Sequence, residues 1–500
     1  MNCGAKQMKR IIAFILMAII SCSMIFCISC SKSASGGETS ADNNGTFANT
    51  DEPTAEADPY DPGLPETDFA GMKFRILTID PDDRFWWSNT QVDATEETGD
   101  IVNDAIYKRN RSIEKKYNFI IDMAYMTDAQ LTPAIKNSVS SGSNDYEMVI
   151  PPIDRAAAMS HSGYLYNLNN VDYLDFSRKW WNPSTLHNYS IGNKLYFATG
   201  DFILSDDDAA TSMMYNKNLA QMLGTPSADE LFDVVMAGGW TVDLMFDIAA
   251  EAIADLNGDG RVNYGDRFGL AACHWVQTAF MGACNETLTK KDENDLPVFN
   301  AGNERFINVF DKINSYITNK QLVAIEYMDF PQDLGDLTMN DYALFTAAEL
   351  ACVRLFRSME SDFAILPFPK FDTTQDKYYS FMVTSTCMAI PTSNADTATT
   401  GLILEALNAE SGRLVNPAYY EIAVAKKYFR DDKSFRILEL ILENPVCDVL
   451  YWVHLWGGFD ATFTNLVRRQ GSDIVSTVEK NRDKVEAAIQ KTVEIYAELP

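Results

Sequence analysis

The oxygen-bearing residues between Asp255 and Asp266 have the spacing of an EF-hand-type calcium loop. Counted from Asp255, oxygen-bearing side chains fall at positions 1, 3, 5, 9 and 12, and a glycine at position 6 permits the tight turn. Asp266 stands where glutamate is usual, and its shorter side chain reaches less far. We expect a structural calcium ion here, the alternative being a polar loop at a helix end. The expected ligands are Asp255, Asn257, Asp259, Arg261 through its backbone carbonyl, Asn263 and Asp266.

The residues on either side of this loop predict the elements that hold it. Thr241 fits a helix N-cap, Asp243 would lie in the first turn, and apolar positions continue to Ile253. A strand is expected at 268–270. Calcium would therefore fasten a helix to a strand, which is a structural role rather than a catalytic one.

Tryptophan is the second residue type with chemical content. The eight tryptophans are Trp86, Trp87, Trp180, Trp181, Trp240, Trp275, Trp452 and Trp456. Several of them lie in polar or glycine-containing segments, and flat aromatic rings can stack on the C–H faces of sugars. We expect ligand contacts from Trp86, Trp87, Trp180, Trp240 and Trp456. We expect Trp275 and Trp452 to be buried in the core. Burial in the core is also the alternative for the other tryptophans.

The sequence lacks the common motifs of several enzyme classes. The sequence has no HExxH zinc motif, no GxSxG elbow, no phosphate-binding P-loop and no CxxC pair, and its four histidines are scattered. A glycosidase needs only two carboxylates, and nothing singles out such a pair among 70 acidic residues. We therefore expect binding without catalysis.

Strands alternate with helical patterns at the start of the polar body. Strands are expected at 72–79, 119–121 and 146–150, and a helix at 101–117, where apolar residues recur at helical spacing. Alternation of this kind predicts a largely parallel sheet covered on both faces. Ligands bind such sheets beyond the carboxyl ends of the strands, so the loops at 80–90 and 151–155, and the segment around Trp180, are candidate binding segments.

The first 29 residues have the pattern of a signal peptide. Lys6, Lys9 and Arg10 precede an apolar run from Ile11 to Ile28, and the following sequence is small and polar. A membrane-spanning helix is the alternative, because about 20 apolar residues can cross a bilayer. We favour cleavage.

Two cysteines at the end of this leader resemble the lipidated residue of a bacterial lipobox. Residues 19–22 fit the pattern better, but a chain beginning at Cys22 would keep an exposed apolar stretch. We therefore prefer Cys30 as the lipidated N-terminus. Residues 30–67 are polar and small, which is typical of a flexible linker.

Charge and size limit the remaining possibilities. Loss of the three leader cations takes the formal net charge from −29 to −32, which argues against nucleic acid and anionic membrane surfaces as partners. About 430 residues exceed one ordinary core, so two lobes are expected. Five cysteines remain outside the leader, and because five is odd no complete disulfide framework is implied.

Four segments in order resemble family 1 of the bacterial extracellular solute-binding proteins, the maltose-binding-protein-like group. They are 145–168, the Met-Tyr-Asn-Lys-Asn-Leu run at 214–219, 341–345 and 363–369. The resemblance implies an α/β fold of two periplasmic-binding-protein-like lobes, each a mostly parallel sheet flanked by helices. Hinge strands would cross near 210–215 and 384–390. Lobe 1 would comprise 68–211 and 386–445, and lobe 2 would comprise 212–385 and 446–500.

The same resemblance implies a function and further site residues. Asp154 and Arg155 would bind ligand hydroxyls just past a strand end, and Glu349 would turn toward the ligand. The chain would be a monomeric, extracytoplasmic, lipid-anchored component of an ABC importer that captures a carbohydrate, by preference an oligosaccharide, and presents it to a membrane permease. The alternatives are a surface glycan-binding lipoprotein without a transporter, a secreted glycoside hydrolase, or a receptor for peptides or other solutes.

Overall fold

A computed structural model describes most of the chain beyond the linker. The described residues are 58–83, 92–263, 265–326, 332–356, 359–382, 385–425, 432–448, 456, 458–469 and 471–500. Cys30, Trp86, Trp87 and Trp452 lie outside them, so their predicted roles stay predictions. No helix within the described ranges is both long and apolar enough to cross a membrane.

The first lobe is built on three parallel strands. β1 (Met72–Ile79) pairs with β2 (Phe119–Met126) on one side and β3 (Met148–Ile150) on the other. Side chains from both faces of β1 are fully buried, among them Ile76 and Leu77. Helices therefore cover both faces, which confirms the predicted sheet. The helices of this lobe are α2 (Ile101–Tyr117), α3 (Asp128–Ser141), α4 (Ile153–His161), α5 (Pro183–Tyr189), α14 (Thr397–Ala425) and the short η1 (Leu168–Asn170).

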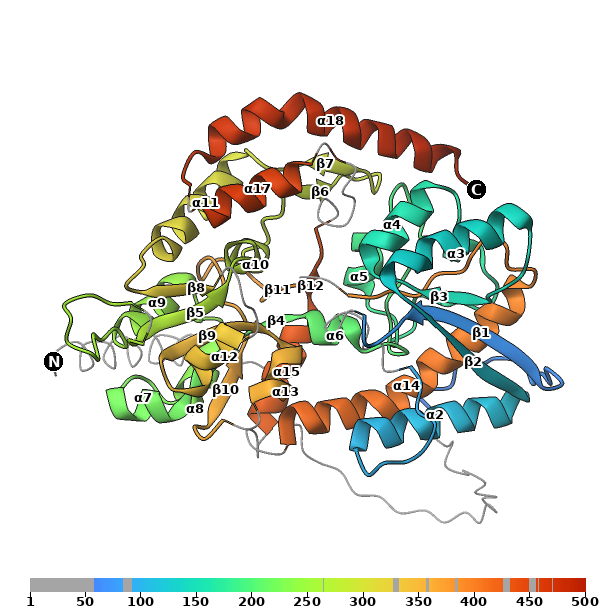
Figure 1. Cartoon of the computed structure of the whole chain (residues 1–500), viewed down its shortest axis with the longest axis horizontal. Helices are drawn as coiled ribbons and strands as arrows, with labels where there is room; N and C mark the ends of the chain where they lie inside the picture. The colour runs from blue at the N-terminus through green and yellow to red at the C-terminus, as the bar shows by residue number, and fades with distance from the viewer. Residues whose placement is uncertain are drawn as a thin grey trace, which may run out of the picture. The chain divides into compact units, whose positions relative to one another are not determined.

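Helix α2 shows why a local pattern could be predicted to the residue. Asp100 caps its start by accepting hydrogen bonds from the Val102 and Asn103 amides, and Asn118 ends it in the left-handed conformation with φ 51°. Its apolar side chains pack on α14. Figure 1 shows α2 and α14 on one side of the three-stranded sheet and α3 on the other.

The second lobe is built on five strands in the order β10-β4-β9-β5-β8. These are β4 (Thr211–Asn216), β5 (Phe268–Cys273), β8 (Val323–Glu326), β9 (Ala343–Glu349) and β10 (Phe363–Leu366). Only β4 runs antiparallel to the others. The helices around them are α7 (Lys217–Leu223), α8 (Ala228–Met236), α9 (Val242–Ala250), α10 (Val276–Ala283), α11 (Glu304–Ile317), α12 (Gln332–Met339), α13 (Leu350–Leu355), α15 (Asp432–Glu443) and α17 (Phe459–Arg468).

Two segments cross between the lobes side by side. Met388 pairs with Ala198 in the first lobe, and Met382 pairs with Ala210 at the entrance to the second. Between Ala198 and β4 lies the short helix α6 (Ser205–Ala209). The crossings fall close to the predicted positions, and each lobe is an α/β unit, as expected.

Helix α15 corrects the predicted lobe boundary. It was placed in lobe 1, but it packs on β10 and α8 of the second lobe. The short strand that follows it, β12 (Pro445–Val446), pairs with β11 (Ser380–Phe381). The boundary therefore lies between α14 and α15, because the apolar face of α15 finds its partner in the second sheet.

The last helix, α18 (Ile474–Glu498), contacts both lobes. Its first half packs on α11, α17 and the hairpin of β6 (Thr289–Lys291) and β7 (Pro297–Phe299). Its end reaches the first lobe, where Tyr496 hydrogen-bonds Ser160 at 2.5 Å and Lys194 donates to the Tyr496 carbonyl. Figure 1 shows α18 extending from one lobe to the other.

The five cysteines outside the leader are buried and form no disulfide bond among themselves. They are Cys273, Cys284, Cys352, Cys387 and Cys447.

Candidate functional site

One edge of the five-stranded sheet collects side chains that could contact a ligand. The parallel strands β5, β8, β9 and β10 all end at this edge, and antiparallel β4 begins there. Thr211, the first residue of β4, is paired with Glu349, the last residue of β9. Because ligands of open α/β sheets bind beyond the carboxyl ends of the strands, this edge is the candidate site of the second lobe.

Trp275 and Gln277 follow β5 at this edge. Trp275 precedes α10 and packs beside a hydrophobic cluster, yet it is the one tryptophan of the described residues that keeps substantial exposed surface. The prediction that Trp275 is buried in the core is therefore only partly right. Gln277 is 1% exposed, and neither of its amide atoms has a hydrogen-bond partner. An unpaired buried amide is costly, so a ligand offering a donor and an acceptor would stabilise it.

Four aspartates gather where the chain crosses toward β4. These hinge aspartates are Asp201, which precedes α6, and Asp206, Asp207 and Asp208 within it. Asp208 is buried and accepts a hydrogen bond from the Tyr419 hydroxyl at 2.8 Å. The other three keep some exposed surface. None of these aspartates was among the predicted site residues, because only the fold brings Asp201 and α6 together at the crossing.

Burial of the hinge aspartates favours their protonated forms. Desolvation raises the pKa of Asp201 to about 8, although a hydrogen bond to Asn416 opposes the rise. Desolvation also raises the pKa of Asp206 to about 6, and it raises that of Asp207 well above the usual range, with repulsion from the neighbouring aspartates adding to the effect. Perturbed carboxylates with remaining solvent access are typical of functional sites.

Glu349 lies at the same edge, next to α6. The Leu350 amide donates to the Ala210 carbonyl at 2.9 Å, which ties the end of β9 to the start of β4. Burial raises the pKa of Glu349, and its carboxylate accepts from the Cys352 thiol at 3.6 Å. Its position agrees with the predicted ligand contact, which stays a prediction.

Asp154 and Arg155 occupy the corresponding edge of the first sheet. Both lie in the first turn of α4, directly after β3. Arg155 forms a two-pronged ion pair with Asp128, with N–O distances of 3.1 and 2.7 Å, and its Nη1 lies 3.5 Å from Asp154. The guanidinium thus links the ends of β2 and β3. It keeps about a third of its side-chain surface exposed, at 36%, so ligand contact by this pair stays a prediction.

Three predicted ligand tryptophans are instead core residues. Trp180, Trp240 and Trp456 are at most 1% exposed, so this structure leaves no ring face free to stack on a sugar. Their indole N–H groups are also satisfied. Trp180 donates to Glu405 at 3.0 Å, Trp240 to the Pro367 carbonyl at 2.8 Å and Trp456 to Thr492 at 2.6 Å. The polar residues that flank these tryptophans in the sequence gave no indication that the rings are buried.

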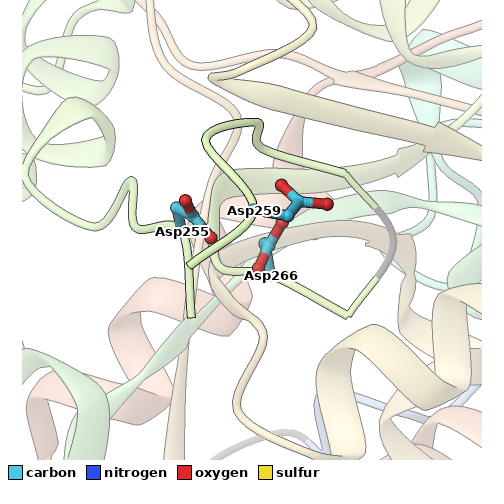
Figure 2. Close-up of side chains that lie close together, drawn as sticks. All are labelled: Asp255, Asp259 and Asp266. Carbon is cyan, nitrogen blue, oxygen red and sulfur yellow. The ribbon is translucent and has the colours of Figure 1, made fainter. Parts of the chain in front are cut away.

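The acidic loop brings three of its aspartates together. Carboxylate oxygens of Asp255, Asp259 and Asp266 all lie within 4.8 Å of one another, and Figure 2 shows the three side chains around the same turn. Asp266 is fully buried, and its carboxylate accepts hydrogen bonds from the backbone amides of Leu256 and Asn263, both at 2.9 Å. This hydrogen bonding lowers the pKa of Asp266 and keeps it ionised.

The surroundings of this loop also match the prediction. Helix α9 begins after the N-cap Thr241, and Ala254 pairs with Arg267 just before β5. The loop thus joins a helix to a strand. Because the clustered oxygens are hard ligands of the kind calcium prefers, the donor set fits the ion.

Comparison with known proteins identifies the fold. No protein-family model matches the chain, and no curated protein matches its sequence. A cyclo/maltodextrin-binding protein complexed with maltotetraose superposes with a TM-score of 0.54 at 12% identity, covering 85% of this chain and 96% of that one. An ABC substrate-binding protein from Listeria monocytogenes, in complex with cycloalternan, gives 0.52 at 10% identity, covering 84% and 99%.

A third solved structure agrees with these two. The maltose/maltodextrin-binding domain from Bdellovibrio bacteriovorus, bound to maltotriose, gives a TM-score of 0.51 at 13% identity, covering 85% of this chain and 100% of that one. At such identities the likeness is one of fold. The chain has the two-lobed maltose-binding-protein-like fold.

Proposed function

We propose that the chain is the lipid-anchored substrate-binding component of an ABC importer and that it captures an oligosaccharide between its lobes. The observation that carries the proposal is the sheet edge beside the crossing segments. There the hinge aspartates and Glu349 offer hydrogen-bond acceptors, Trp275 offers an aromatic surface, and Gln277 offers an unsatisfied amide. Sugars are bound by this combination of polar and aromatic groups.

Capture needs contributions from both lobes. In a two-lobed receptor the ligand favours closure only if it contacts both sides, because its differential affinity for the closed state sets the population shift. The second lobe offers Trp275, Gln277 and Glu349, and the first offers Asp154 and Arg155. The side chains that could contact a ligand are thereby divided between the lobes.

The direct test is a binding screen with the purified chain from residue 62 onward. Thermal shift and calorimetry over neutral and charged mono- and oligosaccharides should find at least one ligand that raises the melting temperature. Small-angle scattering with that ligand should show a more compact particle. Trp275→Ala should weaken binding by about tenfold or more, whereas Trp181→Phe, a substitution in the core, should leave the affinity unchanged.

The rival functions predict different results from the same material. Hydrolysis of a labelled oligosaccharide panel would favour a glycoside hydrolase and contradict the proposal. Sugar binding with unchanged scattering at saturation would favour a static glycan binder. Binding of peptides but not sugars would favour a receptor for other solutes.

We also propose that the loop from Asp255 to Asp266 binds calcium in a structural role. Asp255, Asn257, Asp259, Asn263, Asp266 and the Arg261 carbonyl would hold the ion. Its two positive charges would offset the repulsion among three neighbouring aspartates. The readout is independent of ligand capture, because calcium should raise the melting temperature of the apoprotein and magnesium at equal concentration should raise it less.

The lipid anchor is tested separately in a bacterial host. Expression with a radioactive fatty acid should label the wild-type chain and Cys22→Ala, but not Cys30→Ala. Labelling of Cys30→Ala together with loss of label in Cys22→Ala would move the anchor to Cys22.

A further inference from the structure

A groove on the first lobe carries positive charge, although the whole chain is strongly acidic. The groove has a volume of about 590 Å³, and helix α2 forms most of its wall. Its charged lining residues are the four cations Lys108, Arg111, Lys115 and Lys116 and the one acid Glu97, which gives a local charge of +3 in a chain of net charge −29. We name this surface the α2 groove. Because exposed charges are screened beyond about 8–10 Å, the net charge of the chain does not describe it.

Two of the four cations have no acidic partner. Lys108 and Arg111 each pair with one acid, at 3.1 and 2.8 Å, and keep 60% and 50% of their side-chain surfaces exposed. Lys115 and Lys116 are also exposed, and within the described ranges neither forms an ion pair. The helix dipole favours cations in the last turn of α2, which accounts for these two lysines but not for Lys108 and Arg111.

Residues 68–71, which lead into β1, lie against the end of α2. The Phe69 amide donates to the carbonyl of Tyr117, the last residue of α2, at 2.9 Å. The side chain of Asn118 donates to the Asp68 carboxylate at 2.7 Å. The segment that joins the body to the predicted lipid anchor therefore reaches β1 beside the two unpaired lysines.

The α2 groove lies away from the candidate ligand edge of the first lobe. Helix α2 is followed directly by β2, which runs toward the edge that holds Asp154 and Arg155. The eight residues of β2 span about 23 Å at about 3.3 Å per residue. Figure 1 shows α2 along the outside of the first lobe. A surface that contacts the α2 groove therefore leaves the ligand edge free.

The exposure of the four cations favours an extended anionic surface over a single small anion. Ammonium and guanidinium groups bind phosphate oxygens through charge-assisted hydrogen bonds. One free anion gains little at so exposed a site, because water and salt screen the charges. An anionic membrane presents many phosphates at once, and each lysine or arginine near it contributes about fivefold in affinity. Attachment of the chain to that membrane would raise the effective concentration of the phosphates further.

We propose that the α2 groove is a docking surface for the phosphate headgroups of an anionic membrane, which orients the tethered body with its ligand edge away from the lipid. This departs from the expectation drawn from the net charge. The inference deepens the proposed lipid anchoring and adds a second, electrostatic contact with the same membrane. The contact itself needs neither the lipid nor a bound sugar.

Vesicle flotation of the chain from residue 31 onward, which lacks the predicted lipid, tests the inference. At low salt, vesicles of phosphatidylcholine with about one lipid in three replaced by phosphatidylglycerol should bind the chain at least about fivefold more tightly than phosphatidylcholine alone. High salt should remove the difference, because the contact is electrostatic.

Matched variants locate the contact. Lys115→Gln/Lys116→Gln should bind the anionic vesicles about tenfold or more weakly than the wild type. Lys480→Gln/Lys484→Gln removes two exposed lysines from α18 and should bind as the wild type does. Melting curves check that both variants fold, and Lys116→Gln alone, with an expected loss of about threefold or more, replaces the first variant if it does not.

Lysine acylation followed by mass spectrometry gives an independent readout on the wild-type chain. Anionic vesicles should protect Lys115 and Lys116 and leave Lys480 and Lys484 reactive. Protection of Lys115 and Lys116 by inorganic phosphate but not by vesicles would identify a site for a small anion and overturn the membrane docking.

The remaining outcomes separate this inference from the proposed function. Equal binding to both kinds of vesicle, or wild-type binding by Lys115→Gln/Lys116→Gln, would overturn the docking surface while leaving the lipid anchor and oligosaccharide capture intact. Absence of fatty-acid labelling would overturn the anchor, but it would not change the vesicle binding of the chain that lacks the lipid.

Discussion

The indole N–H of Trp180 donates to the carboxylate of Glu405, 225 residues further along the chain, at 3.0 Å. The neighbouring Trp181 donates to the other oxygen of the same carboxylate, also at 3.0 Å. Glu405 is 1% exposed and lies on α14. One buried carboxylate therefore holds a tryptophan pair in the core, a pair whose sequence context suggested a ligand-binding surface.

We predict that Glu405→Gln lowers the free energy of unfolding by about 1–3 kcal/mol, because an amide offers one acceptor oxygen to two indole donors. Urea unfolding monitored by tryptophan fluorescence measures the loss. A variant as stable as the wild type would show that the paired hydrogen bonds contribute little.

The same variant should change how stability depends on pH. Burial raises the pKa of Glu405 to about 7 from a usual value of 4.5. Between these values the folded chain holds a proton that the unfolded chain releases, so this group's contribution to stability is lost as pH rises from about 4.5 to about 7. The difference between wild type and Glu405→Gln should follow that trend, and a flat difference would contradict it.

Replacement of Trp275 should mainly weaken ligand binding, whereas replacement of Trp240 should mainly lower stability. Trp275→Ala should weaken saccharide binding by about tenfold or more and cost less stability than a core substitution, because the side chain is only partly buried. Trp240→Ala should cost about 3–5 kcal/mol of stability, because the ring is fully buried. Calorimetry and urea unfolding of both variants separate binding from packing.

Two aspartates of the acidic loop should also differ. Asp259→Ala should remove the stabilisation by calcium and leave the calcium-free protein nearly unchanged, because Asp259 is exposed. Asp266→Ala should also destabilise the calcium-free protein, because its carboxylate accepts from backbone amides within the loop. Melting curves of both variants, each recorded with calcium and with a chelator, give the four melting temperatures. An undiminished calcium response in Asp259→Ala would contradict the proposed site.

The end of α18 should be held by its contacts with the first lobe. Tyr496→Phe removes the hydrogen bond to Ser160 and keeps the ring that packs against Tyr196. We expect a loss of about 1 kcal/mol and faster amide exchange over the last turns of α18, measured by mass spectrometry. Unchanged exchange there would mean that packing alone holds the helix end.

Local patterns predicted the elements well where the chain itself supplies the stop signals. The helix expected at 101–117 is α2 to the residue, since Asp100 and Asn118 cap it. Thr241 caps α9 as expected. The strand expected at 119–121 extends to Met126, because pairing with β1 continues past the local apolar run.

The sequence alone determined the features that arise from residues close together in the chain. The spacing of the loop from Asp255 to Asp266, the caps of the helices and the alternation of strands and helices depend on neighbouring residues. The tertiary structure decided which side chains are accessible, because burial depends on partners far along the chain. Glu405 draws Trp180 into the core, and the crossing near α6 brings Asp201 beside Asp207, so that desolvation and repulsion raise the pKa of both carboxyls.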